Sequence, residues 1–484
     1  MSTFALWRLF HRPHTRGVSG HTSMLAIVAF AAATAIFLTV LGGVHGFVWR
    51  ASADHTFLCA FDSNACAPGT YKLWAKQFAD PMSPATYAST YLMLAIFACI
   101  LLVVPFVALA GSAARLVASR RDARLATLRL IGVSQSQVVR LTAMDAAGQA
   151  LVGALIGIIG YFALMPVIML LNFQNQHFTF EELWVGSPAL IAVIIGVILL
   201  ALVSSLVTLR RVSITPLGVT ARQSQPLPTG WRVVIFIVVL MAAIAVLGNV
   251  QLFSALGTGV LYTIIFAMIA LPFALVNLIG SWVVTARARA KARRPKDAAT
   301  MIAMRRILDN PKRAWRNVSG IALAVFIAGI TSVASLFGSS ATPTGVDPND
   351  PNLLFMRDIG SGGLLTLAFA AVLAAVSCGV MQAGSVYDQA NEYRLLVLEG
   401  TDVRTLNRAR FIEVLTPLTV VVAVAAGCSF LLMMPLFAQL MTDPITLLSF
   451  VGGIALCFAL VSIGAFASNR VAAGLNLTDY RADD

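Results

Sequence analysis

The sequence predicts an all-α integral membrane protein with ten transmembrane helices, arranged as two four-helix blocks separated by a two-helix insert. Three observations predict this class. The 484-residue chain is 58% hydrophobic and only 11% charged, with a mean hydropathy of +0.84. Its apolar residues gather in runs of membrane-spanning length, and its basic residues fall in alternate gaps between those runs. A soluble fold of this size cannot bury so much apolar surface, so a soluble class is excluded.

Ten apolar runs are long enough to cross a bilayer. A helix needs about 20 apolar residues to span the hydrocarbon layer of about 30 Å. The first run is too long for the apolar region of a cleaved signal peptide, so we interpret it as a span. The expected spans cover residues 23–48, 88–114, 146–171, 188–209, 231–249, 256–284, 318–338, 361–383, 412–436 and 446–468.

The basic residues assign the gaps to the two sides of the membrane. Of the 34 lysines and arginines, only Arg50, Lys72, Lys76 and Arg357 fall on one side, and the others fall on the opposite side or in the tails. Lysine and arginine are enriched in cytoplasmic segments, so we expect both termini in the cytoplasm. The net charge of +13 is therefore a topology signal, and no nucleic-acid partner is expected. The excess of arginine over lysine and the abundance of alanine favour a bacterial cytoplasmic membrane.

The two halves of the chain resemble each other. Aligning LRLIGVSQSQVVRLTAMDAA (128–147) with LVLEGTDVRTLNRARFIEVL (396–415) pairs Leu128 with Leu396, Gly132 with Gly400 and Arg140 with Arg408. Upstream, LWRLFHRPHTR (6–16) aligns with MRRILDNPKRA (304–314), and both are expected to form amphipathic helices at the inner membrane surface. The expected domains are therefore residues 1–221 with the first block, 222–286 with a linker and the two-span insert, and 287–484 with the second block.

The paired cytoplasmic segments are each expected to form a helix broken at a glycine. Gly132 followed by Ser134 has the pattern of a helix stop and a new N-cap. The second copy repeats the pattern with Gly400 followed by either Thr401 or Asp402. Such an elbow is rigid and protrudes from the membrane, so it suits docking into a groove of a soluble partner.

These segments also carry a family resemblance. RLATLRLIGVSQSQVVR (124–140) resembles the signature of FtsX-like permeases, and LRRVSITPLGV (209–219) resembles the end of the fourth span in that family. Glu392 lies where the family has an acidic residue, whereas Arg124 occupies this place in the first copy. Two FtsX-like blocks with an extra helical pair resemble the ten-span permeases of the bacitracin-export type. Those permeases carry a large extracellular domain, but this chain has only residues 338–358 at that point.

The resemblance implies that this chain is the permease of a type VII ABC transporter and that a partner ABC ATPase homodimer binds ATP and Mg²⁺. Energy transmitted through the elbows would export a lipophilic or peptide-like compound, such as an antimicrobial peptide or a drug. The residues expected to couple the permease to the ATPase are Arg124, Leu125, Leu128, Arg129, Ile131, Gly132, Val133, Ser134, Gln137, Glu392, Tyr393, Leu396, Leu398, Glu399, Gly400, Thr401 and Asp402.

The chain itself shows no pattern for catalysis. No lysine follows a glycine, so the phosphate-binding Gly-Lys of a P-loop is absent, and no catalytic residues, metal ligands or bound cofactor are expected. Asp145 and Glu413 lie at the expected starts of two spans, where negative charge favours the helix dipole. The span centres carry almost no charged residues, which disfavours an ion-coupled secondary carrier.

Two further points stay open at this stage. FtsX-like proteins also include transmembrane signalling levers that regulate cell-wall hydrolysis, so signalling is an alternative to export. Cys59 and Cys66 lie in the longest outer loop, where a disulfide is one interpretation and two free thiols or a redox pair are the others.

Overall fold

The structure of the protein is a computed structural model. It describes residues 19–51, 84–119, 135–174, 176–213, 230–339, 351–388, 395–396 and 398–437, together with residues 448, 451–456, 458–459 and 462–463. Structural statements below refer to these residues alone.

The first half forms four long helices. They are α2 (Ser19–Ala51), α5 (Pro84–Ser119), α7 (Gln135–Met169) and α9 (Gly186–Ser213). A small subdomain connects α7 to α9 and consists of β1 (Asn172–Phe173), β2 (Gln176–His177) and the one-turn helix α8 (Phe180–Leu183). The strands pair antiparallel, with Asn172 opposite His177.

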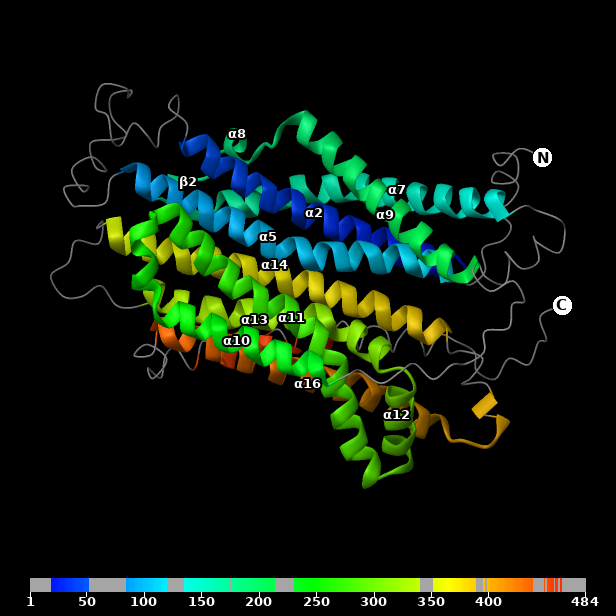
Figure 1. The fold of residues 1–484 in the computed structure, drawn as a ribbon. Helices are drawn as coiled ribbons and strands as arrows, with labels where there is room; N and C mark the ends of the chain where they lie inside the picture. Colours follow the sequence, from blue (N-terminus) through cyan, green and yellow to red (C-terminus); the bar gives the residue numbers. More distant parts are fainter. Residues whose placement is uncertain are drawn as a thin grey trace.

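The second half continues with α10 (Trp231–Gly248), the 3₁₀ helix η2 (Val250–Leu256) and α11 (Thr258–Arg293). Helix α12 (Ala298–Asp309) is short, and α13 (Pro311–Ser339), α14 (Pro351–Asp388) and α16 (Val403–Phe437) are long. Neighbouring long helices run in opposite directions, as Figure 1 shows, so successive connections alternate between the two ends of the bundle.

Eight of the described helices are long and apolar enough to cross a membrane. They correspond to eight of the ten expected spans, and the all-α membrane class is confirmed. The expected span at 318–338 lies in α13, whose apolar stretch in the described residues is the shorter Val318–Ile330. The expected span at 446–468 lies mostly outside the described residues. Ten spans therefore remain a prediction.

Several helices continue beyond their apolar spans at the basic end of the bundle. Helix α11 runs to Arg293, although the expected span ends at residue 284. The residues after that span extend the helix by about 14 Å at 1.5 Å per residue. Here α11 and α12 together form a projection beside the start of α16 (Figure 1). These extensions were missed because hydropathy reports the apolar part of a helix and not its length.

The helices pack in the same order in both halves. Helix α2 packs against α5 and α7, and α13 packs against α14 and α16. The two halves meet mainly where α5 contacts α14. This shared order agrees with the internal repeat that the sequence predicts. The insert helices α10 and α11 lie against α16 and α13, so they cover the second block.

Small residues allow the closest helix contact in the first block. A Cβ added to Gly153 of α7 would lie 2.5 Å from Cβ of Phe30 on α2, and one added to Gly157 would lie 2.6 Å from Cβ of Thr34. In a membrane, where the lipid is as apolar as the side chains, such close packing is a main source of helix association. These glycines therefore set the distance between α2 and α7.

Helix α13 is the centre of the second block. Every residue from Ile321 to Ala328 is buried, because α11, α14 and α16 surround this helix. Helix α12 has one buried face, made by Ala299, Ala303, Met304 and Ile307. That face packs against α11 and α16, which differs from the expectation of an amphipathic helix lying on the membrane surface. The reason is that protein, rather than lipid, covers its apolar side.

Candidate functional site

The second elbow has the backbone geometry that the sequence predicts. Gly400 has φ +90°, a left-handed conformation that glycine adopts without steric cost. The amide of Thr401 donates to the carbonyl of Leu396 at 2.9 Å, which is the bond that closes a Schellman motif at a helix C-terminus. The carbonyl of Asp402 accepts from the amide of Leu406 at 3.1 Å. Asp402, rather than Thr401, therefore occupies the N-cap position of α16, which begins at Val403.

The elbow presents apolar side chains at its surface. Leu395 is 60% exposed and Leu398 is 53% exposed, beside the exposed Glu399 and Gly400. This segment lies outside the apolar spans, at the basic end of the bundle. Exposed leucine in water costs free energy that burial against a partner recovers, at about 25 cal/mol per Å². The elbow therefore has the properties of a docking surface.

The remaining predicted coupling residues are placed as follows. Gln137 lies in the first turn of α7 and Leu396 is half-buried beside the Gly400 turn. Outside the described residues lie Arg124, Leu125, Leu128, Arg129, Ile131, Gly132, Val133, Ser134, Glu392 and Tyr393, and so do Cys59 and Cys66.

The first turns of α16 are connected to the projection formed by α11 and α12. Arg408 pairs with Asp297 at 3.0 Å, and Arg306 lies 3.8 Å from Glu413. The Nζ atom of Lys291 donates to the hydroxyl of Thr416 at 3.3 Å. The Arg408–Asp297 pair is exposed and contributes at most about 1 kcal/mol. These contacts nevertheless position α16 against its neighbours.

The structure corrects one interpretation of the two acids near the elbows. Asp145 lies well inside α7 and Glu413 lies well inside α16, because these helices begin at Gln135 and Val403. Neither carboxylate can act on the helix dipole, whose effect is confined to the first turn. Glu413 instead faces Arg306, and Asp145 is buried.

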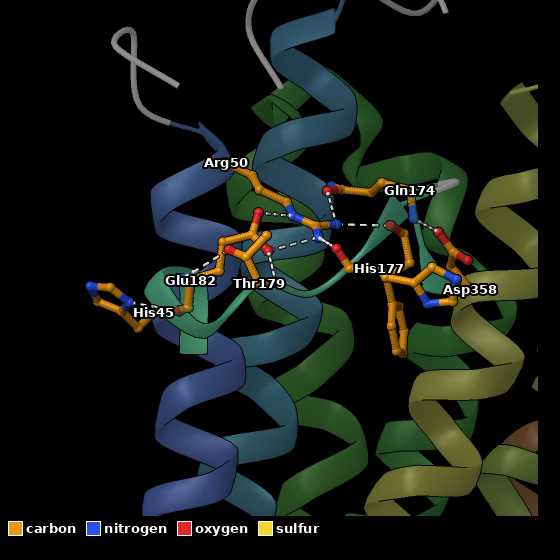
Figure 2. Close-up of polar contacts among 8 residues, drawn as sticks. His45, Arg50, Gln174, His177, Thr179, Glu182 and Asp358 are labelled. Atoms are coloured by element: carbon orange, nitrogen blue, oxygen red, sulfur yellow. Dashed lines mark hydrogen bonds and ion pairs between the residues drawn. The ribbon is translucent and has the colours of Figure 1, made fainter. Parts of the chain in front are cut away.

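A second polar site lies at the opposite end of the bundle, and Arg50 is its centre. The guanidinium is 2% exposed and makes two hydrogen bonds to the Glu182 carboxylate, Nε at 2.7 Å and an Nη at 3.0 Å. It also donates to the carbonyl of Phe173 at 2.8 Å, the side chain of Gln174 at 3.3 Å and the carbonyl of His177 at 3.1 Å. Figure 2 shows this fan of bonds from the end of α2 to the β1–β2 hairpin.

Local sequence features hold the acceptors of Arg50 in place. Thr179 and Glu182 form a capping box at α8, since each side chain bonds the backbone amide of the other. The ring of Phe178 lies 4.4 Å from the guanidinium carbon, in the geometry of a cation–π contact. The ring Nδ1 of His45 lies 2.8 Å from the carbonyl of Glu182. The carboxylate of Glu182 thus accepts hydrogen bonds both from the capping box of α8 and from Arg50.

Asp358 joins this outer site to the second half of the chain. This buried residue of α14 accepts hydrogen bonds from the hydroxyl of Tyr91 on α5, at 2.7 Å, and from the amide of Gln174, at 2.6 Å. The network from Arg50 through Gln174 to Asp358 therefore connects α2, the hairpin, α5 and α14 at one end of the bundle. We call these residues, Arg50, Tyr91, Gln174, Glu182 and Asp358, the outer network.

The sequence patterns do not predict the outer network. They place Arg50 on the side where basic residues are rare and say nothing of Glu182 or Asp358. One signal was available, because Arg50 is a basic residue directly after an apolar run on the side where basic residues are rare. Among the described residues, no group of three or more His, Cys, Asp or Glu side chains could hold a metal ion. The hydrogen bonds of the outer network connect helices and the hairpin to one another.

The fold and these two sites define a multi-pass membrane protein. Arg50 lies at the end of α2 and Arg357 near the start of α14, whereas the basic residues of α11, α12 and the start of α13 belong to the opposite end of the bundle, which carries the elbow. Residues 95–217 match the family model described as FtsX-like permease C-terminal, a region that covers α7, α9 and most of α5. The first block therefore contains an FtsX-like permease domain. Members of this family are usually non-catalytic membrane subunits. Comparison with curated proteins gave no match.

Proposed function

We propose that this chain is the permease subunit of an ATP-driven ABC transporter, with the elbows as the docking sites for an ABC ATPase homodimer. The observation that carries the proposal is the FtsX-like permease domain in residues 95–217. The exposed leucines of the second elbow support it, because a soluble partner would cover them. ATP and Mg²⁺ bind to the partner, and this chain transmits its motion.

The shape of α14 supports mechanical transmission. This helix has 38 residues without an internal proline, so it is a rod of about 57 Å. The connection from its inner end leads into the elbow, and Asp358 lies near its outer end. Helix α16, which leaves the elbow, contains Pro417, where a hydrogen bond of the helix is lost. An ATPase that moves the elbow would tilt α14 as a rigid body and bend α16 at this proline.

The outer network is where this tilt would take effect. Asp358 moves with α14, whereas Gln174 and Arg50 belong to the first block. A displacement of 1 Å lengthens a 2.6 Å hydrogen bond beyond the usual range. Cycles of ATP binding and hydrolysis would therefore break and remake the connection between the two outer ends. In the orientation that we propose, both termini lie in the cytoplasm and this end of the bundle faces outward. The movement at this end would expel a lipophilic or peptide-like compound from the membrane.

The proposal is tested by co-expressing the chain with an ABC ATPase encoded in the same operon and measuring co-purification and ATP hydrolysis. Replacing Leu395 and Leu398 by glutamate should weaken binding at least tenfold, because burying a leucine is worth about 1.5–3 kcal/mol. The matched control is Leu252→Glu, at a leucine of η2 that is 76% exposed. Helix α10 begins at the basic end of the bundle and η2 follows its last residues, so Leu252 lies away from the elbow. This variant should bind normally.

Two results would contradict the proposal. In one, no ATPase co-purifies with the intact chain; in the other, the elbow variant and the Leu252 variant behave alike. If the chain does bind and stimulate an ATPase, the phenotype of a deletion strain then distinguishes export from signalling. Sensitivity to drugs or peptides supports export, whereas chaining or division defects point to a signalling lever that regulates cell-wall hydrolysis. Loss of transport caused by an uncoupler alone would indicate an ion-coupled secondary carrier.

A further inference from the structure

A pocket of about 310 Å³ lies between the insert and the second block, at the basic end of the bundle. Arg232 from the start of α10, Ser281 from α11, and Lys312, Trp315, Arg316 and Ser319 from α13 line this pocket. Three of these side chains are cations and two are hydroxyls. None of the lining residues is acidic. Its volume is at the small end of ligand pockets, which suits a compact headgroup rather than a drug-sized compound.

The three helices place the pocket at the edge of the hydrocarbon layer. The apolar window of α10 begins at Trp231 and the apolar stretch of α13 begins at Val318, while the expected span in α11 ends at residue 284. Trp231 and Trp282, which are neighbours of Arg232 and Ser281 in the sequence, are exposed. Tryptophan is enriched where a membrane meets water, so the pocket lies at the depth of lipid headgroups.

The floor of the pocket is rigid. The indole of Trp315 is buried against the backbone of Gly280, where an added Cβ would lie 2.0 Å from the ring. Only glycine at this position allows the ring to lie so close to α11. The distance between α11 and α13, and with it the shape of the pocket, is therefore fixed by this contact.

One hydrogen-bond donor of Arg232 has no acceptor among the described residues, and an anion could supply that acceptor. The Nε atom of Arg232 is buried and has no hydrogen-bond partner among the described residues. A buried donor without an acceptor costs about 1–3 kcal/mol, and a charged group costs more. Guanidinium binds phosphate oxygens through paired hydrogen bonds, and a hydroxyl such as that of Ser281 donates to the same kind of oxygen. The hydroxyl of Ser319 donates to the carbonyl of Arg316 at 3.2 Å.

We propose that this pocket binds the phosphodiester headgroup of an anionic phospholipid from the basic, inner side of the membrane. The exposed apolar side chains of α10 next to Arg232, including Val234 and Val238, provide a surface for the acyl chains. A free phosphate ion shares the headgroup chemistry but lacks this apolar part. Because the pocket joins α10 and α11 to α13, a bound lipid holds the insert against the second block.

The test uses the full chain in a nonionic detergent, with lipid binding measured by native mass spectrometry. Phosphatidylglycerol should bind, and phosphatidylcholine should bind at least tenfold more weakly. The variant Arg232→Gln/Lys312→Gln should lose phosphatidylglycerol affinity by about 100-fold, because each removed cation takes away a charge-assisted hydrogen bond that contributes about tenfold. The single variant Lys312→Gln changes an exposed side chain, so it should fold normally and lose about tenfold.

The matched control is Arg289→Gln/Arg294→Gln, which removes the same charge from exposed positions of the same end that do not line the pocket. It should retain the affinity of the unmodified chain. An equal loss in this control would overturn the proposal, because general electrostatic attraction would then explain the binding. Inorganic phosphate should not displace the lipid at tenfold excess, and displacement there would identify a free-anion site instead. None of these readouts depends on an ATPase.

Discussion

Replacing Arg50 by lysine isolates the contribution of the guanidinium fork to the outer network. An arginine side chain has five N–H donors, and Arg50 uses them in five hydrogen bonds to four residues. Lysine keeps the positive charge but has three donors from a single nitrogen. The change therefore removes the planar fork of donors while it preserves the charge. At a site with paired hydrogen bonds to a carboxylate, it is not a conservative change.

The expected cost follows from the bonds that lysine cannot make. At least two of the five acceptor contacts are lost, and the acceptors lie at a site where Arg50 is 2% exposed. Each buried acceptor without a donor costs about 1–3 kcal/mol, so Arg50→Lys should destabilise the protein by about 2–6 kcal/mol. Arg50→Met should cost at least as much, because removing one partner of a buried ion pair costs about 3–5 kcal/mol.

The measurement is equilibrium unfolding of the full chain in mixed micelles with SDS, followed by tryptophan fluorescence. The control is Arg357→Lys, since Arg357 is exposed at the same end of the bundle and should change stability by less than about 0.5 kcal/mol. A double-mutant cycle with Glu182→Gln then gives the coupling. Glutamine still forms a capping box, so this change tests the charge and not the α8 turn.

The reasoning is refuted if Arg50→Lys matches the Arg357 control, because five buried hydrogen bonds would then contribute nothing that lysine cannot replace. It is also refuted if the losses in Arg50→Met and Glu182→Gln simply add. Residues that share a direct buried pair should instead show a coupling of about 0.5–3 kcal/mol.

Two further predictions concern the packing of α7 and the projection beside the elbow. Gly157→Ala should destabilise the protein by about 1–3 kcal/mol, because the added Cβ would meet Thr34. Gly148→Ala on the same helix has open space around the added Cβ and should stabilise the protein by about 0.5–1 kcal/mol. Equal changes of both variants in thermal unfolding would contradict this prediction. Burial, with smaller effects from nearby cations, lowers the pKa of Lys291, so its charge is unfavourable in the folded state and stability should rise as the pH increases toward 10.5. The pKa of Lys291, followed by NMR after reductive ¹³C-methylation of the lysines and assigned with Lys291→Arg, should lie below 10.5, and a pKa at or above 10.5 would refute the reasoning.

The features that the sequence predicts well are local ones. The apolar spans follow from runs of residues in one window, and eight of them correspond to helices of spanning length. The stop at Gly400 follows from the conformational freedom of one residue and its neighbours, and the structure has the expected left-handed φ there. Helix ends beyond the apolar spans, as in α11, escaped prediction because hydropathy marks where the apolar run ends and not where the helix ends.

The features that sequence reasoning missed depend on residues far apart in the chain. Arg50 meets Glu182, and Tyr91 meets Asp358, only because four helices bring them to one end of the bundle. No local pattern distinguishes a paired outer charge from a solvated one. The same is true of the pocket beside Trp315, whose cations come from separate helices.

By itself, the sequence determined the membrane class, the positions of most spans and the break at the second elbow, because each depends on transfer free energy or backbone freedom over a few neighbouring residues. The tertiary structure alone decided that α13 is enclosed on all sides, that α12 packs on protein, and that buried charges link the outer ends of α2, α5 and α14. The physical reason is that burial and ion pairing are properties of neighbours in space, which a single chain read in order does not contain.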